Sequence, residues 1–217
     1  MTANMTANTT ADLTTRLFDD ADTGPIDPFA VFEQWYALAE AGESSDAHAM
    51  ALASVDADGN PDVRMVLLNA RDERGYCFFT NFDSDKGREL LAHPHAALVM
   101  HWKSIRRQVR MRGPVERVSE AEADAYFASR GRGSRIASTV SRQSQPLESR
   151  TALVREVEAL TEKLEGRDVP RPPHWSGFRL RPTMMEFWKD GEHRLHDRVR
   201  FLRATPVDDW LRNRLYP

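Results

Sequence analysis

The middle of the chain carries short apolar segments separated by turn residues, and this pattern limits the fold more than any other feature. The segments 48–55, 63–68 and 76–81 have the length and the alternation of β-strands. Between them lie Asp58-Gly59-Asn60 and Asp72 to Gly75, which are typical of hairpin turns. Such short connections make successive strands antiparallel neighbours, and the sequence therefore predicts a meander that closes toward a barrel. A doubly wound parallel sheet is not expected, because long alternation of strands with helices is absent.

Helices are predicted on both sides of this meander, with a second strand-rich part at the end of the chain. Asp27 can cap a helix whose first residue is Pro28, and Ser119-Glu120-Ala121-Glu122 is a capping box. We predict helices at 28–40, 84–93, 119–130, 134–141 and 147–164, and further strands at 96–102, 107–112, 177–180, 184–188, 194–202 and 210–215. The expected fold is α+β, mainly β, with one domain over residues 25–217. Residues 1–24 are rich in Thr, Ala, Asn and Asp, and we predict a mobile N-terminal arm.

Composition excludes several classes of protein. Cys77 is the single cysteine of the 217 residues, so an internal disulfide and a cysteine-rich zinc site are excluded. It lies in the apolar run Tyr76-Cys77-Phe78-Phe79, and we predict a core residue rather than a reactive thiol. No apolar run approaches the roughly 20 residues that span a membrane, and no secretory signal is present at the N-terminus. We expect a cytoplasmic protein with no membrane partner.

Positive charge is concentrated in one segment of an acidic chain. The formal net charge is −3, but residues 103–142 contain ten Lys or Arg and four Asp or Glu, a local net of +6. This indicates a localised anionic ligand, a phosphate ester or nucleic acid, unless the segment is simply a solvated face. Arg110 and Arg112 near Trp102 resemble a nucleic-acid surface, but repeated exposed aromatic residues are missing, so we expect no nucleic-acid partner. Arg130-Gly131-Arg132-Gly133-Ser134 has the composition of either a phosphate-binding loop or a plain turn between helices.

Near the C-terminus, Arg194, His196 and Arg198 alternate along the sequence. If this segment is a strand, the three side chains share one face, where two permanent charges flank one imidazole that can exchange a proton. That spacing favours an anion-binding or acid–base site. His193 and His196 also have the spacing of a metal pair on a helix, but no HExxH motif and no carboxylate cluster accompany them, so we predict no metal site. No glycine pattern of a nucleophile elbow surrounds any serine.

Nine separated motifs, together with Ser84 and Lys86, resemble one family in their order and spacing. They are Arg64-Met65-Val66-Leu67-Leu68, Phe79-Thr80-Asn81, Arg107-Gln108-Val109, Tyr126-Phe127-Ala128-Ser129-Arg130, Ser134-Arg135-Ile136, Gln143-Ser144, His174-Trp175-Ser176-Gly177-Phe178, Glu186-Phe187-Trp188 and Arg194-Leu195-His196-Asp197-Arg198. Over residues 28–217 the chain resembles the FMN-dependent pyridoxine/pyridoxamine 5′-phosphate oxidases. The resemblance implies a split β-barrel homodimer with FMN at the subunit interface. It also implies oxidation of a vitamin B6 phosphate ester to the aldehyde, with O₂ reduced to H₂O₂.

The same resemblance assigns roles to individual residues. It implies FMN contacts from Arg64, Met65, Val66, Leu67, Phe79, Thr80, Lys86, Gln108, Trp188 and Arg198, and from Gln143 and Ser144 across the dimer. It implies that Tyr126, Arg130 and Ser134 bind the substrate phosphate. Arg194 and His196 are then the catalytic residues, lying over the pyridine ring of the substrate.

Three departures from the family pattern concern the substrate. Asn69 stands where family members usually have a lysine that helps to bind the substrate phosphate, and Asp85 stands where a basic residue usually precedes Lys86. The segment before Asp27 lacks the basic and aromatic residues that typically close over the substrate. An alternative is a related branch of the family, which oxidises reduced phenazine precursors without a phosphate ester. The presence of Tyr126 and Arg130 with Ser134 favours the phosphate ester.

Overall fold

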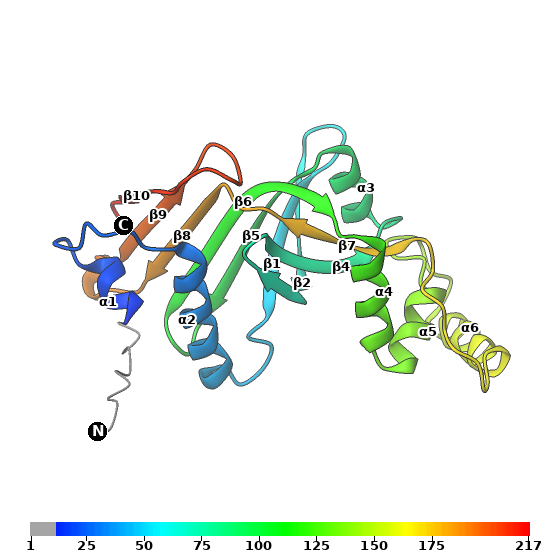
Figure 1. The fold of residues 1–217 in the computed structure, drawn as a ribbon. Helices are drawn as coiled ribbons and strands as arrows, with labels where there is room; N and C mark the ends of the chain where they lie inside the picture. Colours follow the sequence, from blue (N-terminus) through cyan, green and yellow to red (C-terminus); the bar gives the residue numbers. More distant parts are fainter. Residues whose placement is uncertain (1–11) are drawn as a thin grey trace, which may run out of the picture. The chain divides into compact units, whose positions relative to one another are not determined.

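The computed structural model describes residues 12–217, and the chain divides into two compact units (Figure 1). The first unit comprises the residues up to 47, 99–111 and 183–217, and the second comprises 48–98 and 112–182. Strands β5 (His95–Trp102) and β6 (Arg107–Arg117) each contribute residues to both units. The part of the predicted arm before residue 12 lies outside the described residues. Within residues 12–217, no helix combines the length and the apolar character that crossing a membrane requires.

Two helices of the first unit pack on each other. Helix α2 (Pro28–Gly42) starts as predicted, because the Asp27 side chain accepts a hydrogen bond from the backbone N–H of Phe29 at 3.0 Å. Helix α1 (Leu13–Phe18) was not predicted, since residues 1–24 were expected to form an arm without regular structure. A six-residue helix gives no detectable periodicity, and α1 depends on tertiary contacts instead. Leu17 is buried, and the indole of Trp35 donates to the Thr14 hydroxyl at 2.8 Å.

The strands of the first unit follow one another in the order β10-β9-β8-β6-β5. Strands β8 (Met184–Lys189), β9 (Asp197–Leu202) and β10 (Leu211–Arg214) are antiparallel. The prediction that a strand begins at Arg194 is wrong. A 3₁₀ turn, η1 (Glu192–Arg194), precedes β9, and His193 and Arg194 have positive φ angles of 52° and 64°. Arg194, His196 and Arg198 therefore do not share one strand face.

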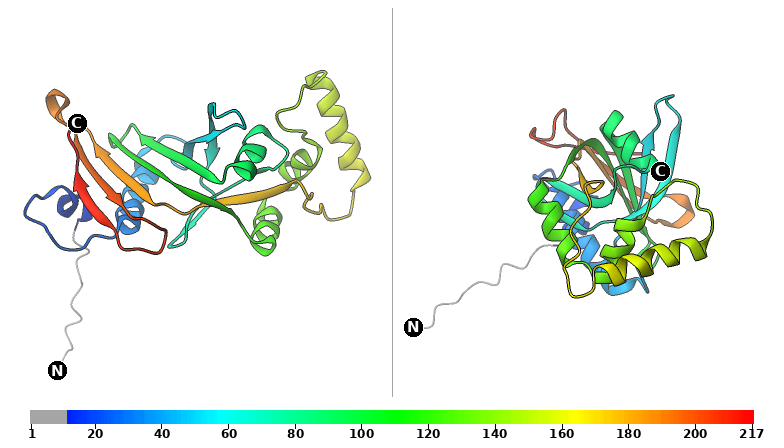
Figure 2. Two further views of the ribbon diagram at one scale, coloured as in Figure 1. Left: turned by 90° about the horizontal axis from the view of Figure 1, so that it is seen from above. Right: turned by 90° about the vertical axis from the view of Figure 1, so that its right-hand side faces the viewer.

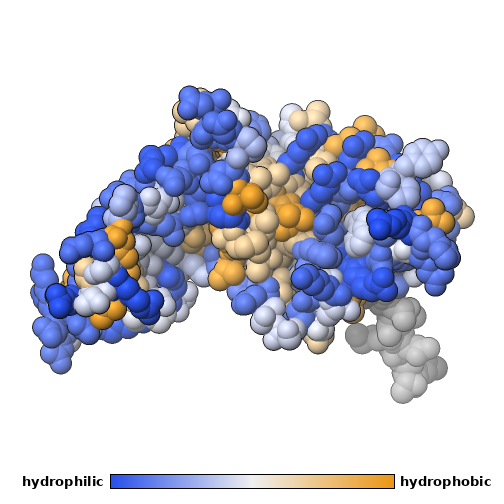
Figure 3. Space-filling model, turned by 180° about the vertical axis from the view of Figure 1, so that it is seen from behind, coloured by the Kyte–Doolittle hydropathy of each residue, from blue (hydrophilic) through white to orange (hydrophobic). Residues whose placement is uncertain are grey.

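The second unit contains the three strands of the predicted meander, β1 (Ala49–Val55), β2 (Pro61–Leu67) and β4 (Gly75–Asn81), but only the first two are neighbours, because β2 pairs with β1 and not with β4. Strands β1 and β2 form an antiparallel hairpin whose turn includes Gly59 at φ 85°. Strand β4 pairs antiparallel with β7 (Trp175–Leu180). A three-residue strand, β3 (Ala70–Asp72), pairs with β4 and was not predicted. One face of β2 exposes apolar side chains: Val63 and Met65 are each 64% exposed. Figure 3 shows that apolar residues are exposed on the face of the molecule that it draws.

All four predicted helices of the second unit are present. They are α3 (Asp85–Ala92), α4 (Glu120–Ser129), α5 (Arg132–Val140) and α6 (Arg150–Lys163), and α5 and α6 lie side by side (Figure 2). The predicted capping box is complete, since Ser119 and Glu122 exchange both hydrogen bonds. The N–H of Ser119 and the guanidinium of Arg179 lower the pKa of Glu122 to about 2. Cys77 is buried, as predicted, and burial raises the pKa of its thiol.

Candidate active site

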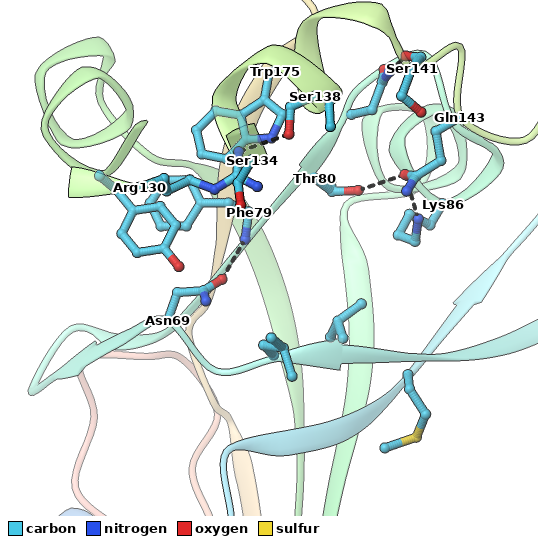
Figure 4. Close-up of a pocket in the computed structure, with 16 residues that line it drawn as sticks. Asn69, Phe79, Thr80, Lys86, Arg130, Ser134, Ser138, Ser141, Gln143 and Trp175 are labelled. Carbon is cyan, nitrogen blue, oxygen red and sulfur yellow. Dashed lines mark hydrogen bonds between the residues drawn. The ribbon is translucent and has the colours of Figure 1, made fainter. Parts of the chain in front are cut away.

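A cavity of about 580 Å³ opens in the second unit, a size typical of cofactor and substrate pockets (Figure 4). Strands β2, β4 and β7, helices α3, α4 and α5, and the loop after α5 provide its walls. The lining residues are Met65, Val66, Leu67, Asn69, Phe79, Thr80, Asn81, Lys86, Tyr126, Arg130, Ser134, Ala137, Ser138, Ser141, Gln143 and Trp175. Polar side chains from separate elements thus meet in one hollow.

One wall of the pocket is a polar group of Lys86, Gln143 and Thr80. The Lys86 ammonium donates to Gln143 Oε1 at 2.9 Å, and the Thr80 hydroxyl donates to the same oxygen at 3.3 Å (Figure 4). Close packing of α3 on the end of β4 fixes Lys86, because a Cβ on Gly87 would lie 2.5 Å from the carbonyl oxygen of Asn81. Only glycine allows that approach. The group offers hydrogen-bond donors without a carboxylate among them.

Two hydrogen bonds hold the loop that carries Gln143 against the end of β4 and the start of α3. Asn81 Nδ2 donates to the carbonyl oxygen of Ser141 at 3.1 Å, and the backbone N–H of Asp85 donates to the Ser144 hydroxyl at 3.2 Å. Ser144 has a φ of 71°, so the chain turns sharply here. Gln143 therefore meets Lys86 of its own chain, while the contact of Gln143 and Ser144 across a dimer stays a prediction.

Two basic residues of this region differ in their partners. Burial lowers the pKa of the Lys86 ammonium, and the nearby guanidinium of Arg64 lowers it further. Arg64 does not line the cavity but contacts Ser54 and pairs with Asp62, and with Glu89 at 3.0 Å. Lys86 is thus the pocket cation that an anion would stabilise most, whereas the charge of Arg64 is already balanced.

Three aromatic rings from three elements form a stack on another wall. Phe79 of β4 stacks on Tyr126 of α4 at a centroid distance of 4.1 Å and on Trp175 of β7 at 5.3 Å, and the rings of Tyr126 and Trp175 are 6.1 Å apart. The interplanar angles are 18° and 11°. The Arg130 guanidinium lies over the Trp175 ring with its Cζ 5.0 Å from the centroid. Offset stacking and the cation–π contact hold these side chains in fixed orientations.

Arg130 is also held by a neutral hydroxyl. Its Nη1 donates to Ser138 Oγ at 2.8 Å, and Ser134 lies one helical turn earlier on the same face of α5 (Figure 4). Burial lowers the pKa of Arg130, because no carboxylate compensates for the lost hydration. The three residues expected to bind a phosphate therefore line one wall, with a half-buried cation among them.

Asn69 supports the pocket wall through its side chain. Its Oδ1 accepts a hydrogen bond from the backbone N–H of Phe79 at 3.1 Å, and its own N–H donates to the carbonyl oxygen of Cys77 at 2.9 Å (Figure 4). These bonds join the end of β2 to β4. The amide oxygen is engaged with backbone, which leaves the Nδ2 hydrogens to face the pocket as neutral donors.

The first unit holds a second group of the expected residues around Trp188. Trp188 of β8 pairs directly with Arg198 of β9, and the His196 ring lies 4.8 Å from the Trp188 ring. Arg198 donates to the buried Glu186 carboxylate at 2.7 and 3.0 Å. Arg110 of β6 binds the other oxygen of Glu186 at 2.6 Å. Burial raises the pKa of Glu186, but the two guanidiniums outweigh burial and the net shift is downward.

The remaining expected residues of the first unit lie close to this group in sequence. Arg194 is exposed in turn η1, and Gln108 is a half-buried residue of β6 next to Val109. His196 Nδ1 lies 3.1 Å from an oxygen of Asp190, a residue to which the sequence had given no role.

The structure thus brings together most of the expected residues, but in two sets. Eleven line the cavity of the second unit, and five belong to the first unit; Arg64 and Ser144 belong to the second unit without lining the cavity. Five lining residues were not predicted as site residues: Asn81, Ala137, Ser138, Ser141 and Trp175. The helical spacing from Ser134 to Ser138 was a usable signal for one of them.

The pocket fits the FMN that the resemblance implied. A half-buried lysine whose hydrogen-bond partner is the neutral amide of Gln143 suits a phosphate monoester, which would replace the lost hydration of the ammonium. Met65, Val66 and Leu67 supply an apolar border for a flat ring system.

Comparison with known proteins identifies the family to which the chain belongs. Residues 39–163 match the family model described as pyridoxamine 5′-phosphate oxidase. Residues 175–217 match the model described as pyridoxine 5′-phosphate oxidase C-terminal dimerisation region, which supports a homodimer. The chain belongs to the pyridoxamine 5′-phosphate oxidase family and has its split-barrel fold.

Individual proteins of this family are similar to the chain over most of its length. The pyridoxine/pyridoxamine 5′-phosphate oxidase of Brucella canis is 57% identical over 198 residues, which cover 91% of this chain and 98% of that protein. The protein of the same name from Brucella suis biovar 1 is also 57% identical, with 91% and 95% covered. Among solved structures, PhzG from Burkholderia lata in complex with tetrahydrophenazine-1-carboxylic acid has a TM-score of 0.84 and 33% identity over 90% of this chain and 95% of that one. A pyridoxamine 5′-phosphate oxidase-related, FMN binding protein from Nostoc punctiforme shares the fold at a TM-score of 0.71 and 15% identity, over 89% of this chain and 100% of that one.

Proposed function

We propose that this protein oxidises pyridoxine 5′-phosphate or pyridoxamine 5′-phosphate to pyridoxal 5′-phosphate with FMN as cofactor, and that O₂ is the electron acceptor and is reduced to H₂O₂. The observation that carries the proposal is the cavity wall of Tyr126, Arg130 and Ser134, which suits a phosphate ester. Two relatives that are 57% identical and bear the name of this activity support it.

The substrate phosphate is bound by a preformed set of donors. Arg130 has its guanidinium plane fixed by Trp175 and Ser138, so little side-chain freedom is lost when a phosphate binds. Tyr126 and Ser134 add neutral hydroxyl donors from α4 and α5. Because burial lowers the pKa of Arg130, a phosphate dianion supplies the opposite charge that the apolar wall lacks.

The cofactor is held by the polar group of the pocket wall. Lys86, Thr80 and Gln143 bind its phosphate and polar chain, with Met65 to Leu67 bordering its rings. When bound, FMN accepts the hydride that leaves the substrate carbon and returns the electrons to O₂.

The proton chemistry belongs to the first unit. His196 accepts the proton that the 4′-hydroxyl or 4′-amino group releases as the substrate carbon is oxidised. Trp188 limits rotation of the imidazole, since the two rings lie 4.8 Å apart. Arg194, exposed in η1, orients the pyridine ring and stabilises negative charge that develops on it. Arg198 has a balanced charge, because the buried Glu186 carboxylate binds it.

A specific observation favours a second candidate, the oxidation of a reduced phenazine precursor. Asn69 places a neutral amide where a phosphate-binding lysine was expected, and its Oδ1 is bound to backbone. The solved PhzG structure, in complex with a tetrahydrophenazine acid, is 33% identical. Such a substrate carries no phosphate ester and would not use Arg130 in the same way.

Steady-state turnover of the FMN-loaded protein distinguishes the two candidates. The B6 proposal predicts O₂ uptake with both phosphorylated B6 substrates and none with a dihydrophenazine carboxylate. Arg130→Ala removes a charge-assisted contact and should raise KM for the phosphate ester by about 10- to 100-fold with a smaller change in kcat.

The control is Arg155→Ala, which removes an exposed arginine of α6. It should leave KM unchanged. Turnover of the phenazine alone, or equal effects of the two arginine variants, would contradict the B6 assignment.

A further inference from the structure

Asp190 lies in the turn after β8 with its carboxylate between two cationic or titratable side chains. Its Oδ1 is 3.1 Å from His196 Nδ1, and its Oδ2 pairs with the Arg106 guanidinium. The Asp190 side chain is 17% exposed and that of His196 is 24% exposed, so both are largely shielded from water. The Asp190 carboxylate is therefore an acidic neighbour of His196, the residue that we propose as the proton acceptor.

The backbone of the turn fixes this pair. The N–H of Asp190 donates to the carbonyl oxygen of Arg106 at 3.1 Å, which anchors the start of the turn to the residue before β6. A Cβ on Gly191 would lie 2.1 Å from the carbonyl oxygen of Leu195, so the close approach of the two ends of the turn requires glycine. With Trp188 on its face and Asp190 at its edge, the imidazole is held from two sides.

His196 Nδ1 has two possible hydrogen-bond partners that exclude each other. The N–H of Gly191 lies 3.2 Å away and needs a lone pair on Nδ1, whereas the Asp190 carboxylate needs a proton there. A hydrogen bond to an ionised carboxylate is roughly twice as strong as one between neutral groups. In this structure the Gly191 N–H donates to Nδ1, and Asp190 lies at ion-pair distance from the same nitrogen. Because the carboxylate interaction would be the stronger one, we expect Asp190 to favour the proton of the neutral ring on Nδ1.

We propose that Asp190 is a positioning residue for the reaction: it holds His196 as the Nδ1–H tautomer, so that the lone pair of Nε2 accepts the substrate proton. When that proton arrives, the ring becomes an imidazolium whose positive charge faces the Asp190 carboxylate. Arg106 binds the second oxygen of Asp190 and fixes the orientation of the carboxylate. This inference rests on the proposed function, since it assumes that His196 is the proton acceptor.

Nitrogen NMR of protein labelled with ¹⁵N-histidine tests the tautomer directly in the FMN-loaded enzyme. The Nδ1 and Nε2 shifts report which nitrogen carries the proton, and a His196→Asn sample assigns the signals among the seven histidines. In Asp190→Asn the neutral amide no longer outcompetes the N–H of Gly191. The proton should move to Nε2, and kcat should fall by about a hundredfold with KM for the phosphate ester within about twofold.

Two further variants separate positioning from a general effect on the fold. Asp190→Glu keeps the carboxylate and should retain the Nδ1–H tautomer with part of kcat. Glu192→Gln removes a carboxylate from the same turn and should change neither the tautomer nor kcat.

Two results overturn the inference: an Nδ1–H tautomer that persists in Asp190→Asn, or a loss of turnover in Asp190→Asn no larger than in Glu192→Gln. The tautomer is measured without turnover. An unmodified protein that oxidises neither B6 substrate therefore refutes the proposed function, while the spectra still decide whether Asp190 sets the tautomer.

Discussion

Lys86 offers the sharpest test of how the pocket binds its cofactor. It is a half-buried ammonium that donates a hydrogen bond to the neutral Gln143, and burial lowers its pKa. Replacement by Met keeps the length and the packing of the chain but removes the charge. The variant should lose affinity for FMN while keeping its affinity for riboflavin, which has the same ring system without the phosphate.

The size of the loss follows from the contact. A hydrogen bond to a charged group contributes about 1.5–3 kcal/mol, so the Kd of FMN should rise by about 10- to 150-fold in Lys86→Met. Gln143 and Thr80 remain as neutral donors, which keeps the loss within this range. Because the ammonium form binds the phosphate, FMN affinity should fall as the pH rises through the lowered pKa of Lys86.

Quenching of flavin fluorescence on titration of the apoprotein measures both affinities. Lys163→Met is the matched control, because this lysine lies on the exposed face of α6. Equal loss of FMN and riboflavin affinity in Lys86→Met would refute the reasoning, since the lysine would then support the fold rather than the phosphate. A pH dependence that persists in the variant would also contradict it.

Two further changes test other parts of the second unit. Glu122→Gln should remove stability that is present above about pH 4.5 and is lost as the pH falls toward 2. Its folded pKa is depressed to about 2, and we expect about 1–2 kcal/mol by denaturant titration after discounting for its partial exposure, with no difference from the parent near pH 2. Asn69→Lys should lower KM for a phosphate ester by about tenfold and lower the free energy of unfolding by about 1 kcal/mol, because the N–H of Phe79 loses its acceptor. An unchanged KM would mean that position 69 does not reach the phosphate.

The sequence predicted those elements whose signals are local. Asp27 and Ser119 cap their helices through residues two or three positions away, so both helix starts were readable from the sequence. Helix α1 and strand β3 were missed because they are short and depend on distant partners, as in the Thr14–Trp35 hydrogen bond. Positive φ angles are uncommon outside glycine and were not expected at His193 and Arg194, so the segment was wrongly extended as a strand.

The same distinction applies to the candidate site. The phosphate-binding set of the second unit was predicted from a resemblance that spans many motifs, and its members do line one cavity. Ser138 and Asp190 were missed, because each acts through a side chain of another segment, Arg130 and His196 respectively, and the turn between them decides whether the two meet. Composition can place a charge in a segment but cannot show which partner balances it.

The buried Glu186 carboxylate couples the evolution of three strands of the first unit. It serves as the shared counter-ion of Arg110 on β6 and Arg198 on β9. Substitution of Glu186 by a neutral residue would leave two guanidiniums without their common partner. Substitution of either arginine alone would leave one oxygen of the buried carboxylate without its hydrogen bonds. Among descendants of this sequence, substitutions at these three positions are therefore expected to occur together rather than singly.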